Sequence, residues 1–141
     1  MDKYINANRV LSRFSRNYME QKKDLPIRPS EMAVLNIITQ RGGQYTPLMI
    51  AELLGVSKSM IAAHIQVLSQ NGYIRKEASE EDKRSFYVLP TDKAVRLTDE
   101  FKIKQTEYLK AIEAVIGETE FEELVRLLDK TLTPERKKEG K

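Results

Sequence analysis

The stretch "YTPLMIAELLGVSKSMIAAHIQVLSQNGYI", residues 45–74, decides the fold. Thr46 is predicted to cap a short helix, and the proline after it to be the first helical residue, because proline's missing N–H costs nothing at that position. Gly55 ends that helix, and Ser57 caps a second one. Two short helices joined at a glycine, with the small Ala51 where they would cross, are typical of a helix-turn-helix. An ordinary helical hairpin is the alternative interpretation.

The second of these helices has an outer face unlike that of an ordinary solvated helix. If Ile61, Ile65 and Leu68 point inward, the outward positions are small or uncharged: Ser59, Ala62, Ala63, Gln66 and Gln70. Such a face fits the major groove of DNA, where Gln66 can bond to a base edge such as that of adenine. The alternative is that this face packs on another protein.

The start of the same helix and the charges around it also favour a polyanion. Ser57, Ser59 and the first backbone amides suit phosphate contacts, and Lys58 adds positive charge. Within residues 32–76 the only carboxylate is Glu52. A segment poor in acids can face DNA without repelling it, although a buried segment would also lack charges.

A two-stranded hairpin is predicted immediately after the two helices. Residues 73–78 and 84–89 are rich in strand-forming side chains and are separated by the charged tip "SEEDKR". A helix-turn-helix followed by a hairpin is the winged-helix layout. At the tip we expect Lys83 and Arg84 to reach a minor groove or the DNA backbone, with Asp82 holding Arg84 in position by a charge-assisted hydrogen bond.

Helices are expected on both sides of this region. An amphipathic helix near the N-terminus places apolar residues at heptad-like spacing: Tyr4, Ala7, Leu11, Phe14 and Tyr18. After the "DLPIRPS" break, Ser30 is predicted to cap a helix that ends at a glycine pair. A helix over residues 91–116 has a similar apolar stripe, and Thr119 with Glu122 forms a capping box for the last helix.

These elements divide the chain into regions. Residues 30–90 are expected to form the winged-helix part, residues 1–25 and 91–133 a helical dimerisation part, and residues 134–141 a flexible polar tail. The fold class is mostly α with a small β-hairpin, that is, one chain of 141 residues with a winged helix-turn-helix between N- and C-terminal helices.

Composition excludes several classes of function. There is no cysteine, so disulfides, thiol switches and zinc–thiolate sites are absent. His64 is the only histidine, and we interpret it as a half-buried structural residue, so neither an enzyme nor a soft-metal or cofactor site is expected. No apolar run approaches the ~20 residues of a membrane helix. The polar N-terminus is unlike a secretory signal, and a cytoplasmic setting fits.

Two motifs together resemble the MarR family of transcriptional regulators. They are "AELLGVSKSMIAAHIQVLSQNGYI" and "EEDKRSFYVLPTDKA", and the second holds the family's Asp-x-Arg wing signature and a Thr-x-Lys helix start. The chain departs from the family at Ala94, where glycine is typical. It also departs at Ala62 and Ala63, where family members often carry a threonine or an arginine that faces DNA, which shifts base reading towards Gln66, the helix start and the wing.

The resemblance implies a homodimer whose terminal helices interlock and which binds double-stranded DNA at a pseudo-palindromic operator, more often as a repressor than as an activator. It also implies modulation by a small ligand, in many members an aromatic or phenolic compound. The side chains that we expect to line such a ligand site are Tyr18, Met32, Leu35 and Phe101. A winged-helix module for protein interaction and a non-specific architectural DNA-binding protein are the alternatives.

Overall fold

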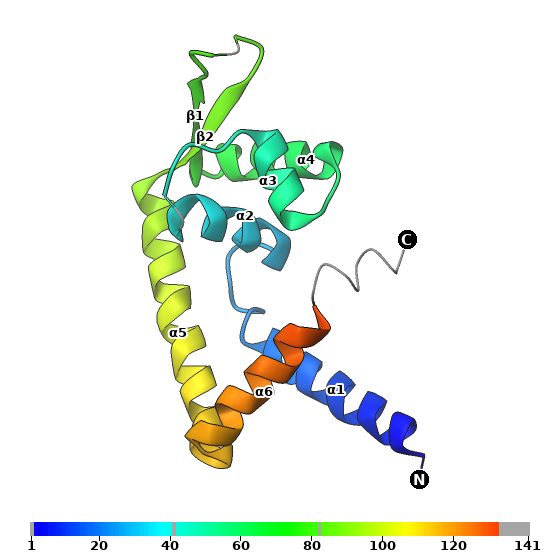
Figure 1. Ribbon diagram of the computed structural model, residues 1–141. Coiled ribbons are helices and arrows are strands. Elements are labelled where there is room, and N and C mark those ends of the chain that lie inside the picture. Colours follow the sequence, from blue (N-terminus) through cyan, green and yellow to red (C-terminus); the bar gives the residue numbers. More distant parts are fainter. Residues whose placement is uncertain (1, 41, 82, 133–141) are drawn as a thin grey trace. The chain divides into compact units, whose positions relative to one another are not determined.

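The computed structural model describes residues 2–40, 42–81 and 83–132. In these ranges the chain forms six helices and one two-stranded sheet, in the order α1–α2–α3–α4–β1–β2–α5–α6 (Figure 1). It divides into two compact units, Met1–Phe101 and Lys102–Lys141, whose boundary falls within α5. The expected fold class is confirmed. The predicted tail at residues 134–141 lies outside the described residues, as does residue 133, the last of the predicted dimerisation part.

The first unit holds the winged helix. Its elements are α1 (Lys3–Glu20), α2 (Pro29–Gln40), α3 (Pro47–Leu54), α4 (Lys58–Gln70), β1 (Ile74–Ala78), β2 (Phe86–Pro90) and the beginning of α5 (Asp92–Ile116). The second unit contains the remainder of α5 and α6 (Glu118–Thr131).

The helix-turn-helix forms as the sequence predicts. The Thr46 side chain accepts a hydrogen bond from the amide of Met49, and Gly55 ends α3 in the left-handed conformation (φ 67°), which glycine adopts without steric cost. Ser57 then caps α4 by accepting from the amide of Met60. The two helices meet at a bend of 116°, within the range of helix-turn-helix motifs. No single described helix is long and apolar enough to cross a membrane, and α3 with α4 meets that criterion only as a bent pair.

The beginning of α2 differs from the prediction. The helix begins at Pro29, so Ser30 lies inside its first turn and is not the cap. Instead, the backbone N–H of Arg28 donates to the carboxylate of Glu31 at 2.9 Å, and the amide of Met32 bonds to the carbonyl of Arg28. Glu31 therefore caps the helix from its third position, which the sequence pattern did not reveal.

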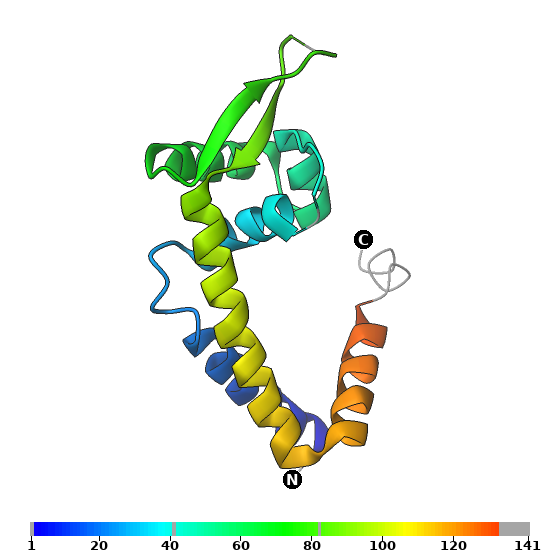
Figure 2. The same ribbon diagram turned by 90° about the vertical axis from the view of Figure 1, so that its left-hand side faces the viewer.

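The hairpin forms a short antiparallel pair. Its register runs from Ile74 opposite Pro90 to Ala78 opposite Phe86, so Pro90 is the last residue of β2 instead of the first residue beyond it. The Val88 amide also donates to the carbonyl of Tyr45 at 2.7 Å, which fixes the hairpin to the segment before α3. In Figure 2 the hairpin extends away from α3 and α4 as a narrow projection.

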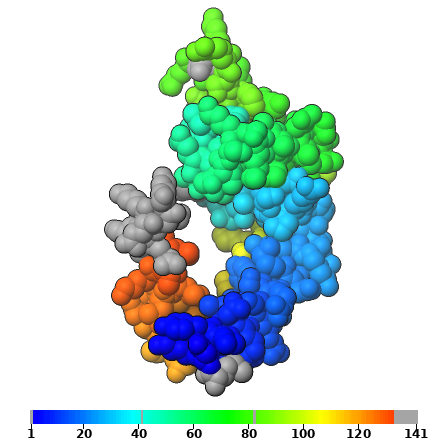
Figure 3. All heavy atoms as spheres, turned by 90° about the vertical axis from the view of Figure 1, so that its right-hand side faces the viewer, coloured from blue at the N-terminus to red at the C-terminus, as the bar shows by residue number. Residues whose placement is uncertain are grey.

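The core of the winged helix lies between α2, α3, α4 and the base of the hairpin. The most completely buried side chains belong to these elements: Met32, Val34, Leu35, Ile50, Ile61, Leu68 and Val88. The inward positions predicted for α4 are thus confirmed. Figure 3 shows α3 and α4 as one closely packed body from which the hairpin projects.

The helices at the two ends of the chain bury none of their described residues. On α1 the rings of Phe14 and Tyr18 stack with centroids 6.1 Å apart, as expected for residues on one stripe. The start of α6 differs from the prediction, because Gly117 occupies the cap position and the helix begins at Glu118. Thr119 lies inside the first turn, so the predicted capping box is wrong.

Candidate nucleic-acid interface

The outer face of α4 is exposed. The six residues that sequence analysis assigned to α4 and its start are all exposed: Ser57, Lys58, Ser59, Ala62, Ala63 and Gln66. Gln70 is exposed on the same face. Because Ala62 and Ala63 have short side chains, another surface can approach the helix closely there, while Gln66 offers both a donor and an acceptor.

The start of α4 combines exposed hydroxyls with helix-end amides. The oxygen of Ser57 is occupied in capping, and it lies 3.2 Å from the hydroxyl oxygen of Ser59. The first intrahelical bond runs from the amide of Ile61 to the carbonyl of Ser57, so the amides of Lys58 and Ser59 precede the helical ladder. Together with the Lys58 ammonium, these groups form a concentration of donors suited to a phosphate.

The hairpin tip carries the second group of predicted residues. Lys83 and Arg84 are exposed, and the tip is closed by a bond from the amide of Ser79 to the carbonyl of Ser85 at 3.3 Å. Asp82 lies outside the described residues, so its role as a clamp for Arg84 stays a prediction.

Two further basic residues on the hairpin were missed. Arg75 and Lys76 are exposed on β1, and the Lys76 ammonium lies 5.0 Å from the centre of the Phe86 ring. The sequence contained a signal for them. Successive residues of a strand point to opposite faces, so two adjacent bases place a charge on both faces of β1, whereas a half-buried strand needs only one polar face. Arg75 and Lys76 place exposed bases near the base of the hairpin as well as at its tip, within residues 74–90, which carry four bases and four acids.

The C-terminal end of α4 is bonded to the start of α5. The Lys93 ammonium donates to the carbonyl of Asn71 at 2.7 Å and lies 4.4 Å from the centre of the Tyr73 ring. The Thr91 hydroxyl donates to the carbonyl of Gly72 at 2.6 Å. A cation at the carboxyl end of a helix is stabilised by the helix dipole. The Thr-x-Lys segment therefore holds α4 in a defined orientation against α5.

The predicted ligand-lining residues lie in two different environments. Met32, Leu35 and Phe101 belong to the packed core, with exposed fractions of 2%, 0% and 3%. Tyr18 is half-buried on α1, where the Lys22 ammonium lies 5.5 Å from its ring centre. Of the four side chains, only that of Tyr18 is exposed to solvent by more than a few percent of its surface.

Two ion pairs among the described residues shift pKa values. Hydrogen bonding to Glu20 raises the pKa of Lys23, and hydrogen bonding to Arg126 lowers the pKa of Glu123. In the described ranges no three histidine or acidic side chains are grouped closely enough to hold a metal ion.

Comparison with known proteins agrees with this geometry. A sequence model of the MarR family matches residues 27–86. The uncharacterized HTH-type transcriptional regulator YkoM of Bacillus subtilis (strain 168) is 31% identical over 136 residues, which cover 92% of this chain and 86% of that protein.

Solved structures of regulators share the fold. FabT of Streptococcus pneumoniae, in complex with DNA, superposes with a TM-score of 0.80 at 20% identity and covers 92% of this chain and 95% of its own. MepR of Staphylococcus aureus superposes with a TM-score of 0.74 at 14% identity, covering 94% and 97%. The full-length relative, the matched winged-helix segment and the shared fold lead to one conclusion: this chain belongs to the MarR family of transcriptional regulators.

Proposed function

We propose that this protein is a homodimeric regulator that binds a pseudo-palindromic operator with sequence preference and acts as a repressor in the cytoplasm. The observation that carries the proposal is the exposed, small and uncharged outer face of α4, flanked by the donors at its start and by the exposed bases of the hairpin. A helix with this face enters the major groove, and the hairpin reaches the adjacent minor groove or backbone. The FabT structure, a DNA complex of the same fold, supports this mode.

The dimer is supported by apolar surface that the chain itself leaves uncovered. On α1 the exposed fraction of Tyr4 is 71% and that of Leu11 is 57%, and on α6 that of Val125 is 51%. Helices with such apolar faces are stable when packed against another helix. Because a two-fold dimer presents two α4 helices, its half-sites are expected about 34–36 Å apart, one turn of DNA.

Charge supports the pairing of unlike terminal helices. Between Lys3 and Met19, α1 carries four bases and no acid: Lys3, Arg9, Arg13 and Arg16. By contrast, α6 carries more acids than bases. A basic amphipathic helix and an acidic one attract each other, so we propose that α1 of one protomer packs on α6 of its partner.

Selection of bound fragments from random duplex DNA tests the proposed function. A sequence-specific dimer enriches a two-fold symmetric motif, and binding to it weakens steeply with salt because phosphate contacts release counterions. Recovery of fragments without a common motif would support an architectural protein instead. If no duplex is bound even at low salt, the outer face of α4 serves a protein partner and the proposal fails.

A further inference from the structure

The outer face of α3 is apolar, although the winged helix completes its core without it. Leu48, Met49 and Leu53 are exposed by 44%, 42% and 47% of their surface. They lie on one side of the helix, because Met49 and Leu53 are one turn apart and Leu48 is beside them. An ordinary surface helix presents charged and polar side chains on its outer side. Exposed apolar side chains gathered on one face are typical of a contact surface for another molecule.

A shallow hollow of about 380 Å³ lies on this face of α3. It is lined by Tyr45, Met49, Glu52 and Leu53, and we call it the α3 hollow. The exposed carboxylate of Glu52 is the only charged group among these lining residues. A side chain that enters the α3 hollow therefore meets aromatic, thioether and aliphatic walls with one negative charge beside them. This combination suits an apolar side chain that has a positively charged neighbour.

A second hollow, on the hairpin, borders the same segment of chain. It has a volume of about 180 Å³ and is lined by Gln44, Glu77, Ala78, Glu80, Glu81 and Tyr87, and we call it the hairpin hollow. Gln44 directly precedes Tyr45, whose carbonyl accepts the Val88 amide at 2.7 Å. The two hollows therefore lie close together where the start of α3 meets the base of the hairpin (Figure 1).

The charge of the two hollows is entirely negative. Their acidic residues are all exposed, and none of them has an ion pair within the described chain: Glu52, Glu77, Glu80 and Glu81. No described base lines either hollow. The nearby Lys76 points to the opposite face of β1 from Glu77, with its ammonium 5.0 Å from the centre of the Phe86 ring. A surface of this charge repels DNA phosphates and attracts lysine and arginine.

We propose that the α3 face and the two hollows bind a basic amphipathic helix of another protein. The apolar side chains of that helix fill the α3 hollow at Met49 and Leu53, and its lysines or arginines face the carboxylates. With eight residues α3 is about 12 Å long, so the contact covers about two turns of the partner. An interface of this size is typical of transient complexes. The described residues expected to contact DNA line neither hollow, so this surface goes beyond the proposed function and does not rest on it.

Binding is tested without DNA, on the full-length protein. The probe is a designed peptide of leucine and lysine whose leucines share one helical face. Backbone amide shifts are followed by NMR as the peptide is added. The expected result is a saturable shift in residues 44–54 and 77–87, with an affinity that falls as salt is raised, because exposed charges are screened. The same peptide with every lysine replaced by glutamate is the control probe and should give no saturable shift.

Two substitutions separate the apolar and the ionic parts of the contact. Leu53→Gln is expected to weaken binding of the lysine peptide roughly tenfold, since it removes an apolar wall of the α3 hollow. Glu52→Gln should weaken it about threefold, the effect of one exposed ion pair. Val95→Gln, at a 39% exposed valine of α5 outside both hollows, is the matched control and leaves the affinity unchanged. Thermal unfolding verifies that each variant is folded.

The outcomes distinguish this surface from other sites and other occupants. Shifts that do not saturate or that fall only on the acidic helix α6, or an affinity that Leu53→Gln leaves unchanged, would overturn the proposal. Equal binding of the glutamate peptide would also overturn it, because the partner would then not need to be basic. If the protein alone associates beyond a dimer and Leu53→Gln prevents this, the face joins copies of this chain and the proposal fails. A protein that binds the lysine peptide but no DNA would refute the proposed function and leave this surface intact.

Discussion

The winged helix and the terminal helices bury their apolar residues to very different extents. Every buried hydrophobic residue of the described chain lies between Ile27 and Phe101, whereas α1 and α6 bury none of theirs. The winged helix completes a hydrophobic core within one chain. The terminal helices instead expose their apolar stripes, as helices that pack against another protein surface do. The difference indicates that intrachain packing supports the proposed DNA-binding surface, while in the proposed dimer the spacing between two such surfaces would depend on association.

The largest effect is expected in the core of the winged helix. Leu35 on α2 is fully buried, so Leu35→Ala should lower the free energy of unfolding by about 2–5 kcal/mol through lost burial and a cavity. Urea unfolding measures it. The same substitution at Leu48, which is 44% exposed on α3, is the matched control and should change stability far less. Equal effects at the two positions would contradict the assignment of the core.

The terminal helices should respond through association. Leu11→Asp places a carboxylate in the apolar stripe of α1 and should raise the dimer dissociation constant by roughly 30-fold or more, as for a hot-spot residue. Sedimentation over a range of protein concentrations measures the change. Asn6→Asp adds the same charge on another side of α1, beside Arg9, and should leave the dimer intact. A Leu11→Asp protein that stays dimeric would show that α1 is not in the interface.

The hairpin tip is expected to contribute to DNA affinity but not to association. Arg84→Ala should weaken operator binding by about 1–3 kcal/mol if the arginine enters a groove, with the dimer unchanged. Fluorescence anisotropy on an operator duplex measures this effect. An unchanged operator affinity would refute the role of the tip in binding DNA.

The predicted role of Asp82 as the partner of Arg84 can be tested by a substitution that removes only the charge of Asp82. If Asp82 holds Arg84 in position, Asp82→Asn should reduce operator affinity, because the arginine loses its charge-assisted bond. If Asp82 merely faces DNA, the same change removes a repulsive charge and affinity should rise. The sign of the change in the same anisotropy assay therefore decides between the two roles.

The smallest effect is expected where α4 joins α5. Lys93→Met removes the bond to the Asn71 carbonyl and the contact with the Tyr73 ring, and should cost about 1 kcal/mol of stability and lower operator affinity slightly. Thermal unfolding and anisotropy report the two effects. Lys102→Met, at an exposed position of α5, is the control and should change neither. If Lys93→Met behaves like the control, the joint does not orient α4.

The features that the sequence predicted well are those specified by neighbouring residues. Thr46 and Ser57 cap their helices and Gly55 ends α3, because each acts within four residues of itself. The incorrect caps arose where two local signals competed. At α2, Glu31 bonds back to Arg28 and makes Ser30 an interior residue, and at α6 the chain turns at Gly117, ahead of Thr119.

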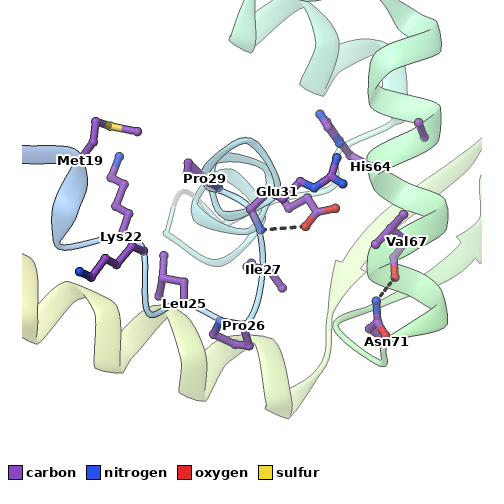
Figure 4. A pocket seen from close by; sticks show the side chains of 13 residues that line it. Met19, Lys22, Leu25, Pro26, Ile27, Pro29, Glu31, His64, Val67 and Asn71 are labelled. Carbon is purple, nitrogen blue, oxygen red and sulfur yellow. Dashed lines mark hydrogen bonds between the residues drawn. The ribbon is translucent and has the colours of Figure 1, made fainter. Parts of the chain in front are cut away.

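Features that depend on distant residues were beyond sequence analysis. The bond between Val88 and Tyr45 joins positions far apart in the chain. Likewise, a hollow beside α4 is lined both by Lys22 and Arg28, from the segment between α1 and α2, and by His64 of α4 (Figure 4). Periodicity indicated that His64 lies at the edge of an apolar face, but not that it lines a hollow together with basic residues of that segment. The exposed residues of α4 were predictable because one helical face fixes them all at once.

The proposed DNA-binding mode requires that the outer face of α4 enters the major groove, and Ala63→Glu tests this most directly. A carboxylate there would meet DNA with a like charge and greater bulk, while the buried face of α4 stays intact. The measurement is operator affinity by anisotropy, alongside unfolding and dimer mass. The account predicts at least a roughly 100-fold loss of affinity, of the order of 3 kcal/mol, with fold and dimer preserved. A folded, dimeric Ala63→Glu protein with the operator affinity of the parent would contradict it.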